Sequence, residues 1–344
     1  MRHLSFSAVG LALAGLIGFA APAIAQDKSF EWKYSHWVPA THPLHNILLE
    51  WSKSIDTASK GTIKISVFPA QQLGKAPDHY DMVEKGIADV VYVSTGYQAG
   101  RMLVTSVAQM PFMISNAEGG SKAFDEWYRP YAAKDMPNVK LCYMYTHDVA
   151  TLHSKKEIRT PDQIKGMKIR PAHATMGQWM NALGATTVQV SAPESREALE
   201  RGVADAITFP WGSLYAFKID GITKFHIDEP MYVATFATMI NQGKYDALSA
   251  DQKKVIDAHC TIEWAGKTAA DWAKWEDDGR QKTRAAGSGH TVVKLTPDEL
   301  AQWRKSAEPV MAKWMDDMKA AGHDGPKVLS EFKAALKKYN ALAD

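Results

Sequence analysis

The chain has 344 residues, of which 46% are hydrophobic and 23% charged, a composition typical of a globular protein with about two domains. Its formal net charge is +2, and basic and acidic residues are interspersed along the chain. This composition excludes a largely disordered chain and argues against nucleic acid as a partner.

The first 25 residues predict a secretory signal peptide. Arg2 is followed by an apolar run over residues 8–21, and Ala23-Ile24-Ala25 supplies the small residues of a cleavage site. That run is too short for a good membrane span, and no later segment has the ~18 apolar residues that a span needs. We therefore predict an exported, soluble protein whose mature chain begins at Gln26.

Strands and helices alternate over the first half of the chain. Short apolar runs predict strands, and longer amphipathic runs predict helices. The expected strands cover residues 30–37, 62–68, 88–93 and 140–145, and the expected helices cover residues 44–59, 76–85 and 117–128. Single helices between strands imply right-handed crossovers and a largely parallel sheet.

The same alternation continues through the middle of the chain. Residues 147–153 open a second unit, and Thr160-Pro161 with Gln163 begins a short helix. Further strands are expected over residues 167–170, 187–190 and 204–209, and further helices over residues 175–183 and 195–201.

Two stretches of the chain repeat each other. Glu84-Lys-Gly-Ile-Ala-Asp89 is echoed by Glu200-Arg-Gly-Val-Ala-Asp205, each with a helix end, a glycine and an apolar strand. Gly61-Thr-Ile-Lys-Ile65 precedes the first, and Gly166-Met-Lys-Ile-Arg170 precedes the second. The repeat predicts one α/β unit built twice, as two lobes. Ligands of open α/β sheets bind at the carboxyl ends of strands near such a junction.

A long helix is predicted over about residues 250–284. It begins at a capping box between Ser249 and Gln252 and contains no proline. A helix of that length outruns one small lobe, so we expect it to lie across both as a brace. Another helix begins at Thr296 and is kinked or broken by Pro309, and a last amphipathic helix follows Pro326.

Cys142 and Cys260 are the only cysteines, the first in a predicted strand and the second in the predicted long helix. An oxidising compartment permits a disulfide between them. Free cysteines also pack as small buried hydrophobes, so both alternatives remain open.

The sequence contains no enzymatic signature that we recognise. It lacks a Gly-x-Ser-x-Gly elbow, a Walker loop, a dinucleotide fingerprint and a Cys-x-x-Cys pair. Its 12 histidines are scattered, with no spacing that predicts a zinc site. We therefore expect that the protein is not an enzyme and that it binds neither a cofactor nor a metal. A hydrolase that uses His147 or His173 as its base is a remote alternative.

Arg170 is the strongest candidate for ligand binding. It ends an apolar strand before Pro171, where its guanidinium would project into the cleft between the lobes. A planar fork of donors matches a carboxylate. The alternative is an arginine at a strand end on the surface.

Other strand ends are expected to face Arg170 across the cleft. Aromatic walls there suit a ligand with an apolar or aromatic body. The candidates are Trp37, Ser94, Tyr97, Phe209 and Trp211.

Over nearly the whole mature length, the chain resembles the DctP-type periplasmic solute-binding proteins of tripartite ATP-independent periplasmic (TRAP) transporters. The stretches that carry the resemblance are Trp37-Val-Pro-Ala-Thr-His-Pro43, Phe68-Pro-Ala-Gln-Gln-Leu-Gly74, Gly86-Ile-Ala-Asp89, Met110-Pro-Phe112, Lys165-Gly-Met-Lys-Ile-Arg170, Ala182-Leu-Gly-Ala185, Ala198-Leu-Glu-Arg-Gly-Val-Ala-Asp205 and Ile240-Asn241.

The resemblance implies a monomeric two-lobe receptor in the periplasm, without catalysis, that delivers an organic acid to a membrane permease. Its fold would have mixed, largely parallel sheets and a long helix spanning both lobes. The family's carboxylate-binding arginine falls on Arg170. We expect lobe 1 to comprise residues 26–147 plus about 236–275, and lobe 2 residues 148–235 plus about 276–344.

Departures from the family pattern bear on the ligand. Sialic-acid-binding relatives place an arginine near Ala150, an asparagine near Trp37 and a glutamate near Ser94, and none of these is kept here. The favoured ligand is therefore a monocarboxylate with an aromatic or apolar body, such as a hydroxycinnamate, an arylglyoxylate or a branched 2-oxo acid.

Two alternatives are a sugar acid and a C4-dicarboxylate. The second carboxylate of a dicarboxylate could meet one of three histidines, His36, His147 or His173. A third possibility is that the chain is a structural or chaperone-like partner protein that binds no small ligand.

Overall fold

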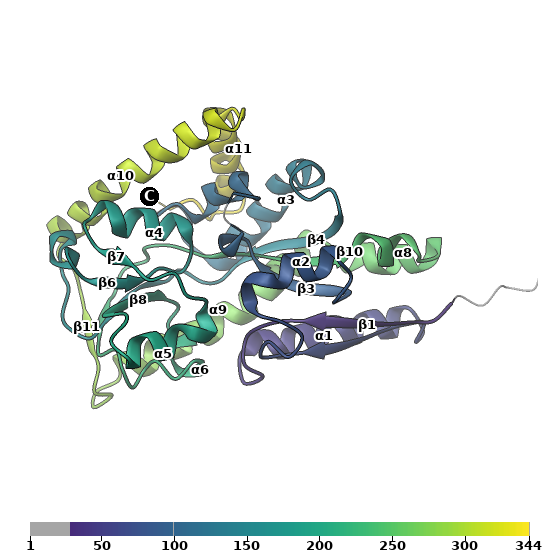
Figure 1. The fold of residues 1–344 in the computed structure, drawn as a ribbon, viewed down its shortest axis with the longest axis horizontal. Coiled ribbons are helices and arrows are strands. Elements are labelled where there is room, and N and C mark those ends of the chain that lie inside the picture. Colours follow the sequence, from purple (N-terminus) through teal and green to yellow (C-terminus); the bar gives the residue numbers. More distant parts are fainter. Residues whose placement is uncertain (1–27, 99, 344) are drawn as a thin grey trace, which may run out of the picture.

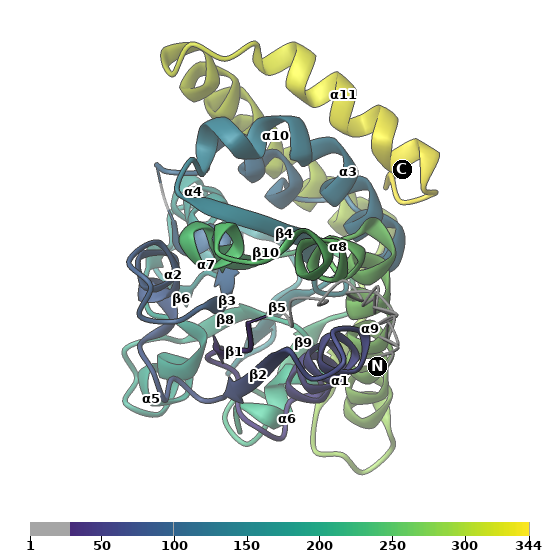
Figure 2. The ribbon, with the colours of Figure 1, turned by 90° about the vertical axis from the view of Figure 1, so that its right-hand side faces the viewer.

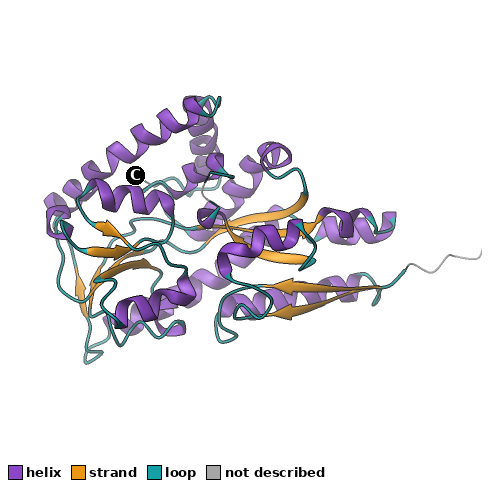
Figure 3. Ribbon diagram, in the orientation of Figure 1, coloured by secondary structure: helices purple, strands orange, loops and turns teal. Residues whose placement is uncertain are grey.

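The computed structural model describes residues 28–98 and 100–343. The predicted signal peptide and its cleavage site after Ala25 lie outside the described residues. The described chain forms two mixed sheets with helices packed around them (Figures 1 and 3). The expected α/β class with mixed sheets is confirmed.

The first sheet has the strand order β2-β1-β3-β10-β4. Strand β1 is parallel to β2 and β3, whereas β10 is antiparallel to β3 and β4. The strands are β1 (Phe30–Ser35), β2 (Ile63–Phe68), β3 (Val90–Ser94), β4 (Val139–Thr146) and β10 (Thr235–Asn241). Its main helices are α1 (Pro43–Ala58), α2 (His79–Glu84) and α3 (Ala117–Asp135). We call this sheet with its helices lobe 1.

The second sheet has the order β11-β9-β5-β8-β6-β7 and, with its helices, forms lobe 2. Strand β6 is parallel to β7 and β8, and β5 is antiparallel to β8 and β9. The strands are β5 (Thr151–Ser154), β6 (Lys168–Arg170), β7 (Thr186–Thr187), β8 (Ala206–Phe209), β9 (Phe225–Ile227) and β11 (Thr291–Val293). The helices are α4 (Ala174–Ala182), α5 (Ser195–Glu200), α6 (Ser213–Ala216) and α10 (Pro297–Ala320).

Short helices connect these elements. They are η1 (Ala76–Asp78), η2 (Thr95–Tyr97), η3 (Leu103–Gln109), η4 (Pro161–Ile164), η5 (Ala192–Glu194) and α7 (Gln242–Asp246).

The repeated stretches adopt the same local structure in the two lobes. Helix α2 ends at Glu84 and α5 at Glu200, and the glycine two residues later has a φ of 70° at Gly86 and 68° at Gly202. Glycine populates this left-handed region without the steric cost that a side chain incurs, so it ends each helix. The predicted duplication is present in the fold.

The aspartates of the repeat show which strands correspond. Asp89 accepts a hydrogen bond from the backbone N–H of Lys33 on β1 (2.7 Å), and Asp205 accepts one from Lys168 on β6 (2.9 Å). Strand β6 therefore corresponds to β1. The sequence pattern pairs Gly166–Arg170 with residues 61–65, at the start of β2. This pairing is wrong, because both sheets place the first strand of the unit between the other two.

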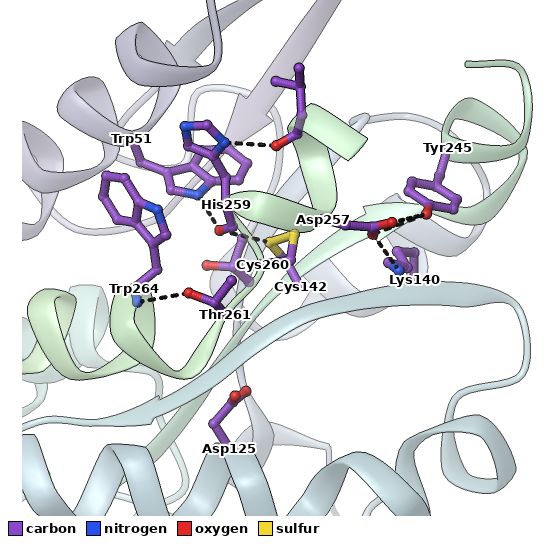
Figure 4. Close-up of a disulfide and its surroundings, with 12 residues drawn as sticks. Trp51, Asp125, Lys140, Cys142, Tyr245, Asp257, His259, Cys260, Thr261 and Trp264 are labelled. Carbon is purple, nitrogen blue, oxygen red and sulfur yellow. Dashed lines mark hydrogen bonds and ion pairs between the residues drawn. A yellow bond between two sulfur atoms is a disulfide. The ribbon is translucent and has the colours of Figure 1, made fainter. Parts of the chain in front are cut away.

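The predicted helix over residues 250–284 is two helices, α8 (Ala250–Ala258) and α9 (Ile262–Arg284). Thr261 interrupts it, because its side chain accepts a hydrogen bond from the backbone N–H of Trp264 and so caps a new helix. Cys260 lies in this interruption rather than in a helix, and it is bonded to Cys142 of β4 (Figure 4). The alternative of a disulfide is the correct one.

Hydrogen bonds surround the disulfide and tie the start of α9 to lobe 1. Arg129 of α3 donates from Nη2 to the carbonyl oxygens of Cys142 (3.1 Å) and Cys260 (3.0 Å). Trp51 of α1 donates from Nε1 to the carbonyl oxygen of His259 at 2.9 Å (Figure 4). Two helices of lobe 1 and the covalent bond therefore hold the same turn.

The C-terminal helices differ from expectation in two respects. Helix α10 continues past Pro309 without a break, and Trp303 and Trp314 on either side of that proline are buried. Helix α11 (Gly325–Lys338) lies along α3 of lobe 1 (Figure 2), with the rings of Phe332 and Trp127 4.8 Å apart. The last segment of the chain therefore packs on lobe 1, although residues 276–344 were assigned to lobe 2. No helix in the described ranges has the length and apolar character needed to cross a membrane.

Removal of the disulfide should destabilise the protein without changing its fold. Because the bond joins residues 118 positions apart, we expect Cys142→Ser with Cys260→Ser to lower the free energy of unfolding by about 2–5 kcal/mol. Urea unfolding of the oxidised protein and of the double variant measures the difference in free energy of unfolding. Added reductant should lower the urea midpoint of the oxidised protein and leave that of the double variant unchanged. Equal midpoints would contradict the expectation.

Candidate functional site

A cavity lies between the two lobes, at the carboxyl ends of β3, β6 and β8. About 400 Å³ of space there is not occupied by protein atoms, a volume that includes solvent at the open side of the cavity. Its walls are mainly aromatic and come from both lobes and from α9. The aromatic lining residues are Trp37, Tyr97, Phe209, Phe217, Tyr232, Phe236 and Trp272.

Five of the eight predicted site residues line this one cavity. They are Trp37, Ser94, Tyr97, Arg170 and Phe209. The structure brings them together because the two copies of the α/β unit face each other with the carboxyl ends of their strands. Trp211, His36 and His173 are not part of its lining.

Arg170 is the one charged residue among those that line the cavity, and it is only 1% exposed. Its Nε donates to the carbonyl oxygen of Val190 (3.0 Å) and its Nη2 to the hydroxyl of Tyr97 (3.0 Å). The guanidinium carbon lies 5.7 Å from the centre of the Phe209 ring.

The guanidinium of Arg170 forms no ion pair within the described chain, although its charge contributes to lowering the pKa of Glu194. Neither an ion pair nor a hydrogen bond from Nη1 links it to a residue in the ranges 28–98 and 100–343. A buried charge is costly unless it is paired, so this arrangement favours an anion in the cavity.

Trp211 lies behind the cavity rather than in its wall, which corrects the prediction made from its position. Its ring packs edge-on against His153 with centroids 5.0 Å apart, and Arg280 covers it at 5.7 Å. Strand β8 ends at Phe209, and the chain then turns at Pro210. A continued strand would place Trp211 on the same face as Phe209. Because the strand ends first, Trp211 points elsewhere.

His36 and His173 both make contacts away from the cavity. Nε2 of His36 bonds Nδ1 of His45 at 2.9 Å within lobe 1. His173 caps α4, and its Nε2 bonds the carbonyl oxygen of Val233 at 3.2 Å. His173 marks a close approach of the lobes, since a Cβ on Gly96 would lie 2.4 Å from the Cβ of His173.

Two other histidines line the cavity, and both are held neutral. Nδ1 of His42 accepts the backbone N–H of Leu44 (3.2 Å), and Nε2 of His147 accepts that of Ala234 (3.0 Å). The remaining nitrogens bond the hydroxyl of Ser213 (3.3 Å) and the carbonyl oxygen of Asp148 (2.5 Å). Burial lowers the pKa of His42 to about 3 and that of His147 to about 4.

Glu276 of α9 holds the loop that follows β8. It is 1% exposed and accepts the backbone N–H groups of Gly212 (2.5 Å) and Ser213 (3.0 Å). The Ser213 hydroxyl (2.5 Å) and the Trp272 indole (2.7 Å) donate to its other oxygen. Burial raises the pKa of Glu276 to about 7, and these four donors act in the opposite direction.

Helix α9 thereby connects both lobes behind the cavity, as the predicted brace should (Figure 1). Its start is bonded to lobe 1 through Cys260, and its end is bound to lobe 2 through Glu276 and through Arg280, which pairs with Asp228 at 2.6 Å. Trp272, between these anchors, lines the cavity.

Sequence reasoning missed the lining residues that do not follow a strand of the repeated unit. His42 caps α1, Phe217 follows α6, Tyr232 lies in the crossover before β10, and Trp272 lies on α9. Only the long helix gave a signal, since a brace across both lobes has to pass the cleft between them. In the described part of the chain, no three residues of the usual kinds are placed to bind a metal.

Comparison with known proteins shows the family. The model of the family described as bacterial extracellular solute-binding protein, family 7 (DctP), matches residues 34–317. Among solved structures, a TRAP solute-binding protein from Rhodoferax ferrireducens with copurified benzoate is 27% identical, with a TM-score of 0.86 over 91% of this chain and 99% of that chain.

Two further solved structures are similar over comparable lengths. A marine metagenome TRAP solute-binding protein with 3-hydroxybenzoate is 28% identical, with a TM-score of 0.86 over 91% of this chain and 99% of that one. One from Bordetella bronchiseptica with (R)- and (S)-mandelate is 29% identical, with a TM-score of 0.82 over 90% and 99% of the two chains.

The contact between α9 and the loop after β8 should not tolerate a methyl group. A Cβ on Gly279 would lie 2.2 Å from the Cα of Gly212. We expect Gly279→Ala to destabilise the protein by about 1–3 kcal/mol through overpacking, although alanine normally favours a helix. Urea unfolding shows whether the substitution lowers or raises the free energy of unfolding. Gly221→Ala, where a Cβ meets nothing within 4 Å, is the control, and a stabilised Gly279→Ala would contradict the expected clash.

Proposed function

The chain belongs to the bacterial extracellular solute-binding proteins of family 7, the receptors of TRAP transporters, and we propose that it binds an aromatic monocarboxylate in the cavity around Arg170. The observation that carries this proposal is the buried guanidinium of Arg170, which lacks a carboxylate partner in the described chain. A ligand carboxylate supplies the missing charge, and the fork of donors fits its two oxygens.

The neutral histidines support a ligand with one carboxylate rather than two. His42 and His147 use both ring nitrogens in contacts with the protein, and their low pKa keeps them uncharged. His36 and His173, two of the predicted partners of a second carboxylate, are not among the lining residues. A second carboxylate would be buried without a partner, at a large desolvation cost.

The walls support an aromatic body over a sugar. Seven aromatic side chains enclose the cavity, and the polar groups of His42, His147 and Ser213 are already bonded to one another or to the backbone. The hydroxyl groups of a sugar acid need acceptors as well as donors, and the acceptor nitrogens of His42 and His147 are already used by the backbone. The similar structures with benzoate, 3-hydroxybenzoate and mandelate, each at least 27% identical to this chain, support the same ligand class.

The family and its solved relatives are receptors, which supports binding without turnover as the role of this chain. The remote alternative, a hydrolase, needs a free base. The nitrogens of His147 and His173 accept from or donate to the backbone, which supports a structural role for both.

We further propose that the mature protein acts as a periplasmic monomer, is cleaved after Ala25, and passes its ligand to the membrane subunits of a TRAP permease. Its lobes would comprise residues 26–147 with about 236–275, and residues 148–235 with about 276–320. Helix α11 belongs with lobe 1, on which it packs.

Arg170→Met should abolish binding and leave the fold intact. Removal of the buried charge relieves its desolvation cost but leaves the carbonyl oxygen of Val190 without its donor, so we expect these effects on stability to offset each other. Loss of the ligand's partner costs at least about 2 kcal/mol, or roughly 30-fold in affinity. Thermal-shift assays with benzoate and related acids measure both effects. Arg201→Met, at an exposed arginine just after α5, is the matched control, and unchanged affinity in Arg170→Met would refute the anchor.

Affinity for an anionic ligand should rise as pH falls through about 7. Protonation of Glu276, whose pKa burial raises to about 7, removes a negative charge beside the cavity, and the cavity histidines stay neutral in this range. We expect roughly fivefold tighter binding at about pH 6 than at about pH 8, equivalent to about 1 kcal/mol. Titration calorimetry with wild type and Glu276→Gln tests this, because the variant should show no such slope.

A further inference from the structure

Two hydrogen-bond donors in the cavity lining have no partner. Nε1 of Trp37 and the hydroxyl of Tyr232 are buried, and neither meets hydrogen-bond geometry with any described residue. Buried donors are almost always satisfied in folded proteins, and each exception needs an explanation. A ligand in the cavity would supply the acceptors.

The hydroxyl of Tyr232 lies within electrostatic reach of the carboxylate anchor. Burial raises the pKa of Tyr232, while the nearby Thr208 hydroxyl and the positive charge of Arg170 act in the opposite direction. The Thr208 oxygen already accepts the backbone N–H of Ala172 at 2.8 Å. The Tyr232 hydroxyl is therefore placed to contact a ligand that Arg170 holds.

Tyr97 adds a third donor from the opposite lobe. Its hydroxyl oxygen accepts Nη2–H of Arg170 (3.0 Å) and the backbone N–H of Ala192 (2.9 Å), both groups that can only donate. The hydroxyl hydrogen of Tyr97 is left without an acceptor in the described chain. It can reach only toward the cavity or the solvent at its edge.

The cavity therefore offers more donors than a carboxylate can accept. Arg170 keeps three of its five N–H groups after its bonds to Val190 and Tyr97, and Trp37, Tyr97 and Tyr232 each add one. A carboxylate has about four acceptor positions. The acceptor nitrogens of His42 and His147 are already used by the backbone. The hydroxyl of Ser94 adds a donor together with its two acceptor positions, so donors still outnumber acceptors among these side chains.

From this excess we infer that the ligand is an aromatic 2-oxo acid, whose keto oxygen accepts from Tyr232 and Trp37 while its carboxylate pairs with Arg170. The inference rests on the proposed function, because it assumes an aromatic acid anchored at Arg170. A keto oxygen is an acceptor without a hydrogen of its own, which suits a site rich in donors. The keto oxygen lies next to the carboxylate, and Tyr232 lines the same cavity as the guanidinium that would hold that carboxylate.

The test compares two ligands that differ only at the carbon next to the carboxylate. Phenylglyoxylate carries a keto group there, and phenylacetate carries a methylene. We expect wild type to bind phenylglyoxylate at least about tenfold more tightly, since a site with buried donors rejects a ligand that leaves them unpaired. Titration calorimetry gives the ratio of the two affinities.

Tyr232→Phe removes only the hydroxyl, so it should lower that ratio by about tenfold. Tyr145→Phe is the matched control, because the Tyr145 hydroxyl is also buried and unpaired but belongs to β4 and does not line the cavity. A variant that merely loosens the fold would weaken both ligands together and leave the ratio unchanged. If Tyr232→Phe does not fold, Trp37→Phe is used for the same measurement.

Equal affinities of wild type for the two acids would overturn the inference, as would a preference that survives both substitutions. In either case, binding that depends on Arg170 would leave the proposed function standing. Absence of binding of every aromatic acid to wild type would overturn the proposed function and the inference with it.

Discussion

The arrangement of the cleft depends on one buried positive charge. Arg170 lies at the end of a strand where the two lobes meet, and its guanidinium is oriented by a carbonyl of its own lobe and by a tyrosine of the other. Desolvation of that charge makes the empty cavity unfavourable and an anion favourable. The aromatic walls strengthen both effects, because they exclude the water that would otherwise solvate the guanidinium. The buried charge and the aromatic walls therefore favour the same occupant, an anion with an apolar body.

Helix α9 explains how two lobes can share a cavity of fixed shape. One end is bonded to the sheet of lobe 1, and the other binds the loop after β8 through Glu276 and through the contact of Gly279 with Gly212. The loop carries Ser213, which bonds His42 of lobe 1. Three separate segments of the chain thus meet behind the cavity, and no polar side chain among Ser213, His42 and Glu276 is left unpaired.

Local patterns predicted local structure well. The glycines that end α2 and α5 and the position of Arg170 at a strand end follow from residues close together in the sequence, and they place the cleft correctly. The same reasoning failed where tertiary contacts decide. A threonine such as Thr261 can cap a helix or lie within one. The sequence does not show which, because the disulfide at Cys260 and the hydrogen bonds around it hold the turn that comes before Thr261. Trp211 follows a strand whose end at Pro210 cannot be read from alternation. His42 and Tyr232 reach the cavity from outside the repeated unit.

The position of β10 has a consequence for the order in which the protein folds. This strand, at residues 235–241, lies between β3 and β4 in the first sheet, so it separates two strands made long before it. During synthesis the first lobe cannot complete its sheet until most of the second lobe has already emerged. Until then, β3 and β4 each have an edge whose backbone groups are unpaired, and such an edge is prone to associate with other chains. An export route that keeps the polypeptide extended until it has crossed the membrane would shorten that exposure, because all strands then arrive nearly together.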